Sequence, residues 1–194
     1  MFESSWGHHL IMRLPSLTLD HADQYRESYK SIPGWGNAYI YPLSDLIPID
    51  NLITRIRPSS ILDFGCGTGS AIARLHNEFP DIHIDGYDPV IPAFIQYPTC
   101  TYDLVMCAAV LHLIDDLHMP LVVSELTELT SNYLFLLIRL TPAIARTEQH
   151  YINLFTNIFT VEYMQVWDFP NASASPPHMA THRNLSILLK KNEI

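Results

Sequence analysis

Residues 61–69 read Ile61-Leu62-Asp63-Phe64-Gly65-Cys66-Gly67-Thr68-Gly69. The stretch begins as an apolar strand, continues with three alternating glycines and leads directly into a helical pattern. Glycines let the backbone turn sharply and approach a ligand closely, and the unpaired N–H groups at a helix start face that ligand. Because the acidic Asp63 lies at the end of the strand, this order of features predicts a binding platform for a nucleotide-like ligand.

A second acidic residue supports this interpretation. Residues 82–87 predict another strand, which ends at Asp88 and Pro89. One helix and one strand separate Asp88 from Gly69, which suits a strand that returns parallel to the first, so we expect Asp88 beside the glycine loop. A carboxylate there can accept hydrogen bonds from both hydroxyls of a ribose. The alternative is an aspartate that only begins a turn before proline, and Asp85, one alternation short of the strand end, is a weaker candidate.

The order of elements predicts an α/β fold, a mostly parallel sheet with helices on both faces. We expect strands at residues 60–64, 82–87, 102–107, 132–140, 159–167 and 184–190, and helices at 44–57, 68–79, 115–129 and 146–158. A loop at 168–182 joins the last two strands, which should therefore form an antiparallel hairpin at one edge. Residues 89–101 are too short and too rich in proline for a full helix–strand–helix unit, so the chain is shortened after its second strand.

We divide the chain into an N-terminal arm and helical cap at residues 1–43 and one domain at residues 44–194. A helix at 21–31 would place Tyr25 and Tyr29 on one face. Trp35 follows in a turn that contains proline and glycine. These aromatic residues are candidates for a lid or a substrate wall, and packing of the cap against the sheet explains them equally well.

Composition limits the classes of protein that fit. The chain has 194 residues, of which 48% are apolar, as expected for a globular domain. Its net charge of −9 argues against nucleic acid as a partner. No apolar run is long enough for a membrane span and the N-terminus lacks a signal-peptide pattern, so we expect a cytoplasmic protein. The three cysteines lack metal-ligand spacing, which predicts reduced thiols and no metal site.

The motifs at residues 61–69, 86–88 and 102–116 together resemble those of the class I S-adenosylmethionine-dependent methyltransferases. The likeness covers about residues 44–191 and implies a Rossmann-like three-layer sandwich. A narrower likeness is to small predicted methyltransferases encoded by bacteriophages. It depends on the tyrosine-containing helix, the glycine turn after it, and the short connection from Tyr87-Asp88-Pro89 to Tyr102.

The resemblance implies S-adenosylmethionine as the cofactor. Asp63 would lie near its amino group, Asp88 would bind its ribose, and the shortened segment leaves Tyr87, Pro89 and Val90 to cover adenine. Ala108 and Ala109 would run beneath the sulfonium. The full set of predicted cofactor-binding residues is Asp63, Gly65, Cys66, Gly67, Gly69, Tyr87, Asp88, Pro89, Ala108 and Ala109.

His112 is the candidate catalytic residue, because it follows the strand that ends under the cofactor and histidine titrates near neutral pH. A packing or capping role explains it at least as well. No Asn-Pro-Pro-Tyr-type signature follows residues 102–107, which argues against methylation of the amino groups of DNA or RNA bases. The sequence therefore predicts a methyltransferase with a small-molecule or protein acceptor. A cofactor-binding protein that acts through interactions, or a polyamine synthase, is the alternative. The acceptor and the oligomeric state stay open.

Overall fold

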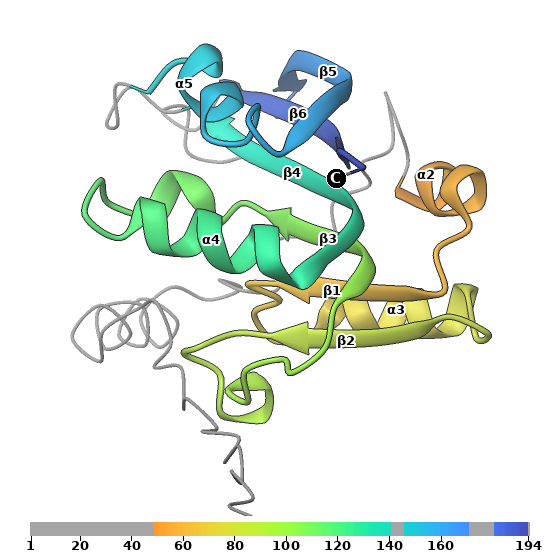
Figure 1. The fold of residues 1–194 in the computed structure, drawn as a ribbon. Helices are drawn as coiled ribbons and strands as arrows, with labels where there is room; N and C mark the ends of the chain where they lie inside the picture. Colours follow the sequence, from red (N-terminus) through yellow and green to blue (C-terminus); the bar gives the residue numbers. More distant parts are fainter. Residues whose placement is uncertain (1–48, 141–145, 171–180, 194) are drawn as a thin grey trace, which may run out of the picture.

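The structure is a computed structural model that describes residues 49–140, 146–170 and 181–193 (Figure 1). The predicted arm and cap at residues 1–43, with Tyr25, Tyr29 and Trp35, lie outside the described residues. None of the described helices combines the length and the apolar character that a membrane crossing needs.

Six strands form one mixed sheet in the order β2-β1-β3-β4-β6-β5. The first four pair in parallel, and β6 is antiparallel to both of its neighbours. The predicted sheet with a C-terminal hairpin is thereby confirmed. The strands are β1 (Ser60–Phe64), β2 (His83–Tyr87), β3 (Tyr102–Ala108), β4 (Thr130–Leu140), β5 (Phe159–Pro170) and β6 (Thr181–Lys191).

Helices cover both faces of the sheet, so the fold is a three-layer sandwich (Figure 1). On one face, α2 (Ile49–Ile56) and α3 (Ser70–Glu78) pack against the sheet through Ile53 and Leu75. On the other face, α4 (Met119–Leu129) and α5 (Glu148–Asn153) belong to a separate apolar cluster that includes Leu126 and Tyr151. The central strands carry near-continuous apolar runs because both of their faces are buried.

Three predicted boundaries were wrong. Helix α4 begins at Met119 and not at Asp115, because a 3-10 turn, η2 (Leu111–Leu113), precedes it and the Asp115 carboxylate accepts the His118 N–H at 2.9 Å. Helix α5 has only six residues. The hairpin strands extend into the predicted loop, since the β5–β6 ladder continues to the pair of Pro170 and Thr181.

The shortened segment after β2 passes around the edge of the sheet. Its 3-10 turn, η1 (Pro92–Phe94), places Phe94 against the apolar cluster on the α3 side. Three residues later, Tyr97 packs against the cluster on the α4 side, where its ring meets the Tyr87 ring edge-on at 5.3 Å. A short loop thus places one aromatic side chain on each face of the edge strand.

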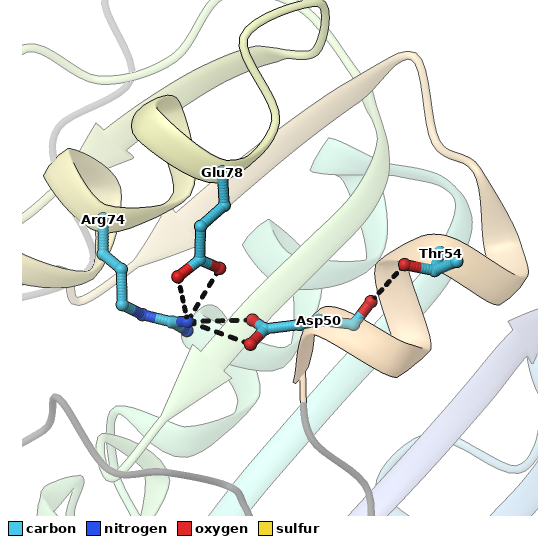
Figure 2. Close-up of polar contacts among 4 residues, drawn as sticks. All are labelled: Asp50, Thr54, Arg74 and Glu78. Carbon is cyan, nitrogen blue, oxygen red and sulfur yellow. Dashed lines mark hydrogen bonds and ion pairs between the residues drawn. The ribbon is translucent and has the colours of Figure 1, made fainter.

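An ion-pair cluster joins α2 to α3 (Figure 2). Arg74 Nη1 donates to Asp50 Oδ1 at 2.9 Å and to Glu78 Oε2 at 2.9 Å. These side chains are 29–42% exposed, and ion pairs with that access to water contribute little stability. Ile53 of the same helix is only 1% exposed. Apolar packing therefore holds α2 in place, and the ion pairs add a small amount.

We predict a clear difference between two substitutions at this contact. Arg74→Met should lower the free energy of unfolding by at most about 1 kcal/mol, whereas Ile53→Ala should lower it by about 2–5 kcal/mol because it leaves a cavity. Urea unfolding followed by circular dichroism measures both. Equal losses in the two variants would contradict this account of how α2 is attached.

Candidate functional site

The site lies at the edge of the sheet where the parallel strands end. In Figure 1 the arrowheads of β1, β2 and β3 point to the same side of the molecule. The glycine loop follows β1, Asp88 follows β2 and Ala109 follows β3. In open α/β sheets, ligands bind in the crevice outside these strand ends.

The glycine loop has a backbone that only glycine adopts easily. Gly65, Gly67 and Gly69 have φ angles of 81°, 56° and 79°. A Cβ at Gly65 would lie 2.2 Å from Val110 Cγ2, and one at Gly69 would lie 2.5 Å from Phe94 Cζ. At these two positions the conformation and the surroundings both require glycine.

Asp88 holds the loop in this shape. The Gly67 N–H donates to Asp88 Oδ2 at 2.9 Å, and the Val90 N–H donates to Oδ1 at 2.9 Å. The prediction that Asp88 lies beside the glycine loop is confirmed. Burial raises the pKa of Asp88 above its ordinary value, although backbone hydrogen bonds from Val90, Gly67 and Ile91 oppose the rise. Each oxygen keeps lone-pair capacity for a further donor, such as a ribose hydroxyl.

Asp63 is also a buried carboxyl group, but unlike Asp88 it receives no hydrogen bond from the described residues. It lies on β1 between Gly86 of β2 and Met106 of β3, and it is only 6% exposed. Burial raises its pKa from 3.8 to about 7, and the charge of Asp88 adds to the rise. A positively charged group placed beside Asp63 would reverse both effects, because it stabilises the carboxylate.

The chain that leaves β3 closes the site from the other side. Ala109 has a φ of 58°, which is rare for a residue other than glycine, and its N–H donates to the Leu137 carbonyl at 2.7 Å. Ala108 is half-buried, and Val110 contacts Gly65 as described. His112 follows within η2 and is buried. The backbone of this segment is therefore fixed next to the glycine loop.

Each of the two acidic residues after η2 has a basic partner. Asp115 Oδ1 contacts His118 Nδ1 at 2.7 Å. Asp116 Oδ1 accepts from Arg146 Nη2 at 2.6 Å, and Arg146 Nη1 donates to the Leu111 carbonyl at 3.3 Å. Arg146 thereby ties η2 to the segment before α5. No sequence pattern indicated Arg146 or His118, because each meets its acidic partner only in the folded chain.

Of the other predicted site residues, Cys66 and Tyr87 are buried in the two different apolar clusters, on opposite faces of the sheet. Cys66 is buried against the α3 side, and burial raises the pKa of its thiol. The Tyr87 ring packs in the core on the α4 side, where it meets Tyr97, and Pro89 is half-buried beside Asp88. Within the described ranges, no group of three histidine, cysteine, aspartate or glutamate residues is placed to hold a metal ion.

The arrangement fits S-adenosylmethionine. The described residues donate no hydrogen bond to the Asp63 carboxyl, which therefore suits an ammonium group. Asp88 has the capacity for ribose hydroxyls. The three glycines let the loop backbone make the sharp turn that such a ligand platform needs.

The fold is the one found in class I methyltransferases. The chain is similar to the magnesium protoporphyrin IX methyltransferase (ChlM) of Synechocystis PCC 6803, solved with bound S-adenosylmethionine. That match has a TM-score of 0.60 and 16% identity over 91% of this chain and 99% of that chain. No family model and no curated protein sequence matches the chain.

Two further solved structures are similar. The 1,6-didemethyltoxoflavin-N1-methyltransferase of Burkholderia thailandensis, solved with S-adenosylhomocysteine and 1,6-didemethyltoxoflavin, has a TM-score of 0.61 and 14% identity over 90% of each chain. The N-methyltransferase NodS of Bradyrhizobium japonicum WM9, solved with S-adenosylhomocysteine, has a TM-score of 0.54 and 15% identity over 89% of this chain and 99% of that chain. At such identities the comparisons establish the fold.

The contact between Gly69 and Phe94 predicts a coupled effect on stability. Gly69→Ala should lower the free energy of unfolding by about 2 kcal/mol or more, since it adds a left-handed backbone penalty of about 1–2 kcal/mol to a clash with the Phe94 ring. In a Phe94→Ala background, the same change should cost only the backbone penalty. A double-mutant cycle by urea unfolding measures the coupling. Equal costs in both backgrounds would contradict the contact.

The buried carboxyl of Asp63 predicts a pH-dependent stability. Its pKa is higher in the folded protein than in the unfolded chain, so the folded state binds the proton more tightly and loses stability as the pH rises from about 4 to about 7. The free energy of unfolding of Asp63→Asn should therefore rise relative to that of the wild type as the pH increases over this range, by at most about 1.4 kcal/mol per pH unit. Urea unfolding across the pH range is the measurement, with the exposed Asp81→Asn as control. A difference that does not change with pH would refute the assignment.

Proposed function

We propose that this protein is an S-adenosylmethionine-dependent methyltransferase that acts on a small-molecule or protein acceptor. The observation that carries the proposal is the pairing of the glycine loop with Asp88, through the Gly67 hydrogen bond, next to the buried Asp63. The methyltransferase fold and the cofactors named for its structural neighbours support it.

Each group has a role in this proposal. Asp63 pairs with the amino group of the cofactor, Asp88 accepts the ribose hydroxyls, and the residues around Asp88 cover adenine. The cofactor supplies an electrophilic methyl group when bound. The protein then has to orient the acceptor, exclude water and remove a proton where the acceptor carries one.

His112 is the proposed base for that proton. It lies on η2, directly after the segment of β3 that borders the glycine loop, and its burial suits a site from which water is excluded. Arg146 holds the same turn through the Leu111 carbonyl, so it acts as a positioning residue.

The acceptor class is inferred from charge. A net charge of −9 supports a small molecule or a protein over a nucleic acid. The free cysteines Cys66, Cys100 and Cys107 favour a reducing compartment, as in the cytoplasm. The narrower likeness to bacteriophage methyltransferases stays a prediction.

The alternatives are separable. A polyamine synthase would use acidic side chains after β3, and here Asp115 and Asp116 are engaged with His118 and Arg146, which favours methyl transfer. A protein that binds the cofactor without using it would pass a binding test and fail a turnover test. Methyl transfer from labelled cofactor, assayed on small amines, carboxylates and proteins, makes that distinction.

We expect S-adenosylhomocysteine to bind with a micromolar dissociation constant in calorimetric titration. Asp88→Asn should weaken binding about tenfold or more, because hydrogen bonds to a charged group are worth about 1.5–3 kcal/mol. The matched control is Asp85→Asn, the same change three residues earlier, on β2, which should leave the affinity within about twofold of the wild type.

Two results would contradict the proposal. The first is no heat and no thermal shift with millimolar S-adenosylhomocysteine or S-adenosylmethionine. The second is equal affinity in the Asp88 and Asp85 variants, which would remove Asp88 from the ligand site.

A further inference from the structure

Asp63 and Asp88 are two buried carboxyl groups at the same strand ends, and their surroundings differ. Asp88 is 5% exposed and both of its oxygens accept backbone N–H groups. Asp63 is equally buried, and none of the described residues donates a hydrogen bond to its carboxyl group. A buried carboxylate without donors or a counter-ion is strongly disfavoured relative to its neutral form.

The groups around Asp63 offer no positive charge. The end of β2 contributes Asp88, the glycine loop contributes the Cys66 thiol, and β3 contributes the Cys107 thiol. Burial and the Asp63 charge raise the pKa of both thiols, so they stay neutral. On α3, Arg74 is engaged with Asp50 and Glu78. In the described part of the chain, Asp88 is the charged group that acts on Asp63.

Of the two acids, Asp63 therefore takes the proton first. Burial raises the pKa of both acids, but backbone donors oppose the rise at Asp88, whereas the charge of Asp88 adds to the burial that raises the pKa of Asp63 to about 7. The empty protein holds Asp63 largely neutral at mildly acidic pH and ionises it near neutrality.

We propose that Asp63 makes ligand binding proton-linked: the site takes a ligand with a positively charged amino group, and Asp63 releases its proton to solvent as that group binds. The inference rests on the proposed function for the identity of the ligand. The step is balanced, since the Asp63 O–H bond breaks, the proton goes to the buffer, and the new carboxylate pairs with an ammonium that is already charged.

The sign of the effect follows from linkage. Below pH 7, binding has to include the cost of removing the proton, so affinity falls as the pH falls. With a free-state pKa of about 7, S-adenosylhomocysteine should bind about tenfold more tightly at pH 8 than at pH 6. Methylthioadenosine lacks the amino acid part and should bind with an affinity that is nearly independent of pH.

Calorimetric titration in two buffers of different ionisation enthalpy tests the proposal directly. At pH 6, S-adenosylhomocysteine should release close to one proton per molecule bound, and this number should fall towards zero at pH 8. Methylthioadenosine should release none at either pH. Asp63→Asn should abolish both the proton release and the pH dependence, while Asp85→Asn at the half-buried position on β2 should leave both unchanged.

The outcomes separate the two proposals. Binding of S-adenosylhomocysteine without proton release at pH 6 would overturn the proton link and leave the proposed function standing. Proton release that persists in Asp63→Asn would assign the proton to another group and overturn the proposal. Failure of both ligands to bind would refute the proposed function and the proton link together.

A second measurement covers the case in which the variant does not fold. The Asp63 carboxyl carbon resonance of the wild-type protein should titrate near pH 7 without ligand and well below pH 6 with saturating S-adenosylhomocysteine. Titration at the same pH in both states would overturn the proposal.

Discussion

The hydrogen bond from the Gly67 N–H to the Asp88 carboxylate is the interaction on which the site depends. It joins the loop after β1 to the end of β2, while the Gly65 N–H reaches the Tyr87 carbonyl at 2.7 Å. These bonds fix a backbone with three left-handed glycines, and that backbone in turn brings Val110 against Gly65. The same carboxylate that holds the loop also adds, through its charge, to the burial that raises the pKa of Asp63.

The short connection after β2 changes the edge of the sheet. In place of a helix and a further strand, residues between Asp88 and Tyr102 turn around β2 and place Phe94 on one face and Tyr97 on the other. The Asp88 N–H donates to the Phe94 carbonyl at 2.9 Å, which links this connection to the site. Val90, next to Asp88 in this connection, is buried.

Much of this could be predicted from the sequence, because the signals were local. The glycine spacing, the apolar run of β4 and the distance to Asp88 each follow from backbone geometry and burial. The start of α4 was missed because Asp115 closes a turn with His118 instead of capping the helix. Arg146 meets Asp116 and the Leu111 carbonyl through contacts between distant segments, and no pattern along the chain encodes these contacts. The same holds for the lack of hydrogen-bond donors to Asp63 among the described residues. The raised pKa of Asp63 in particular follows from burial and from the charge of Asp88, and only the folded chain creates this environment.

The central claim is that the glycine loop and the end of β2 form one ligand site. A nuclear magnetic resonance titration of the amide groups with S-adenosylhomocysteine tests it most directly. We expect saturable shifts of the Gly65, Gly67, Gly69 and Val90 amides, with the Leu189 and Lys190 amides of β6 unchanged. Absence of any shift at millimolar ligand, or shifts confined to other parts of the sheet, would contradict it.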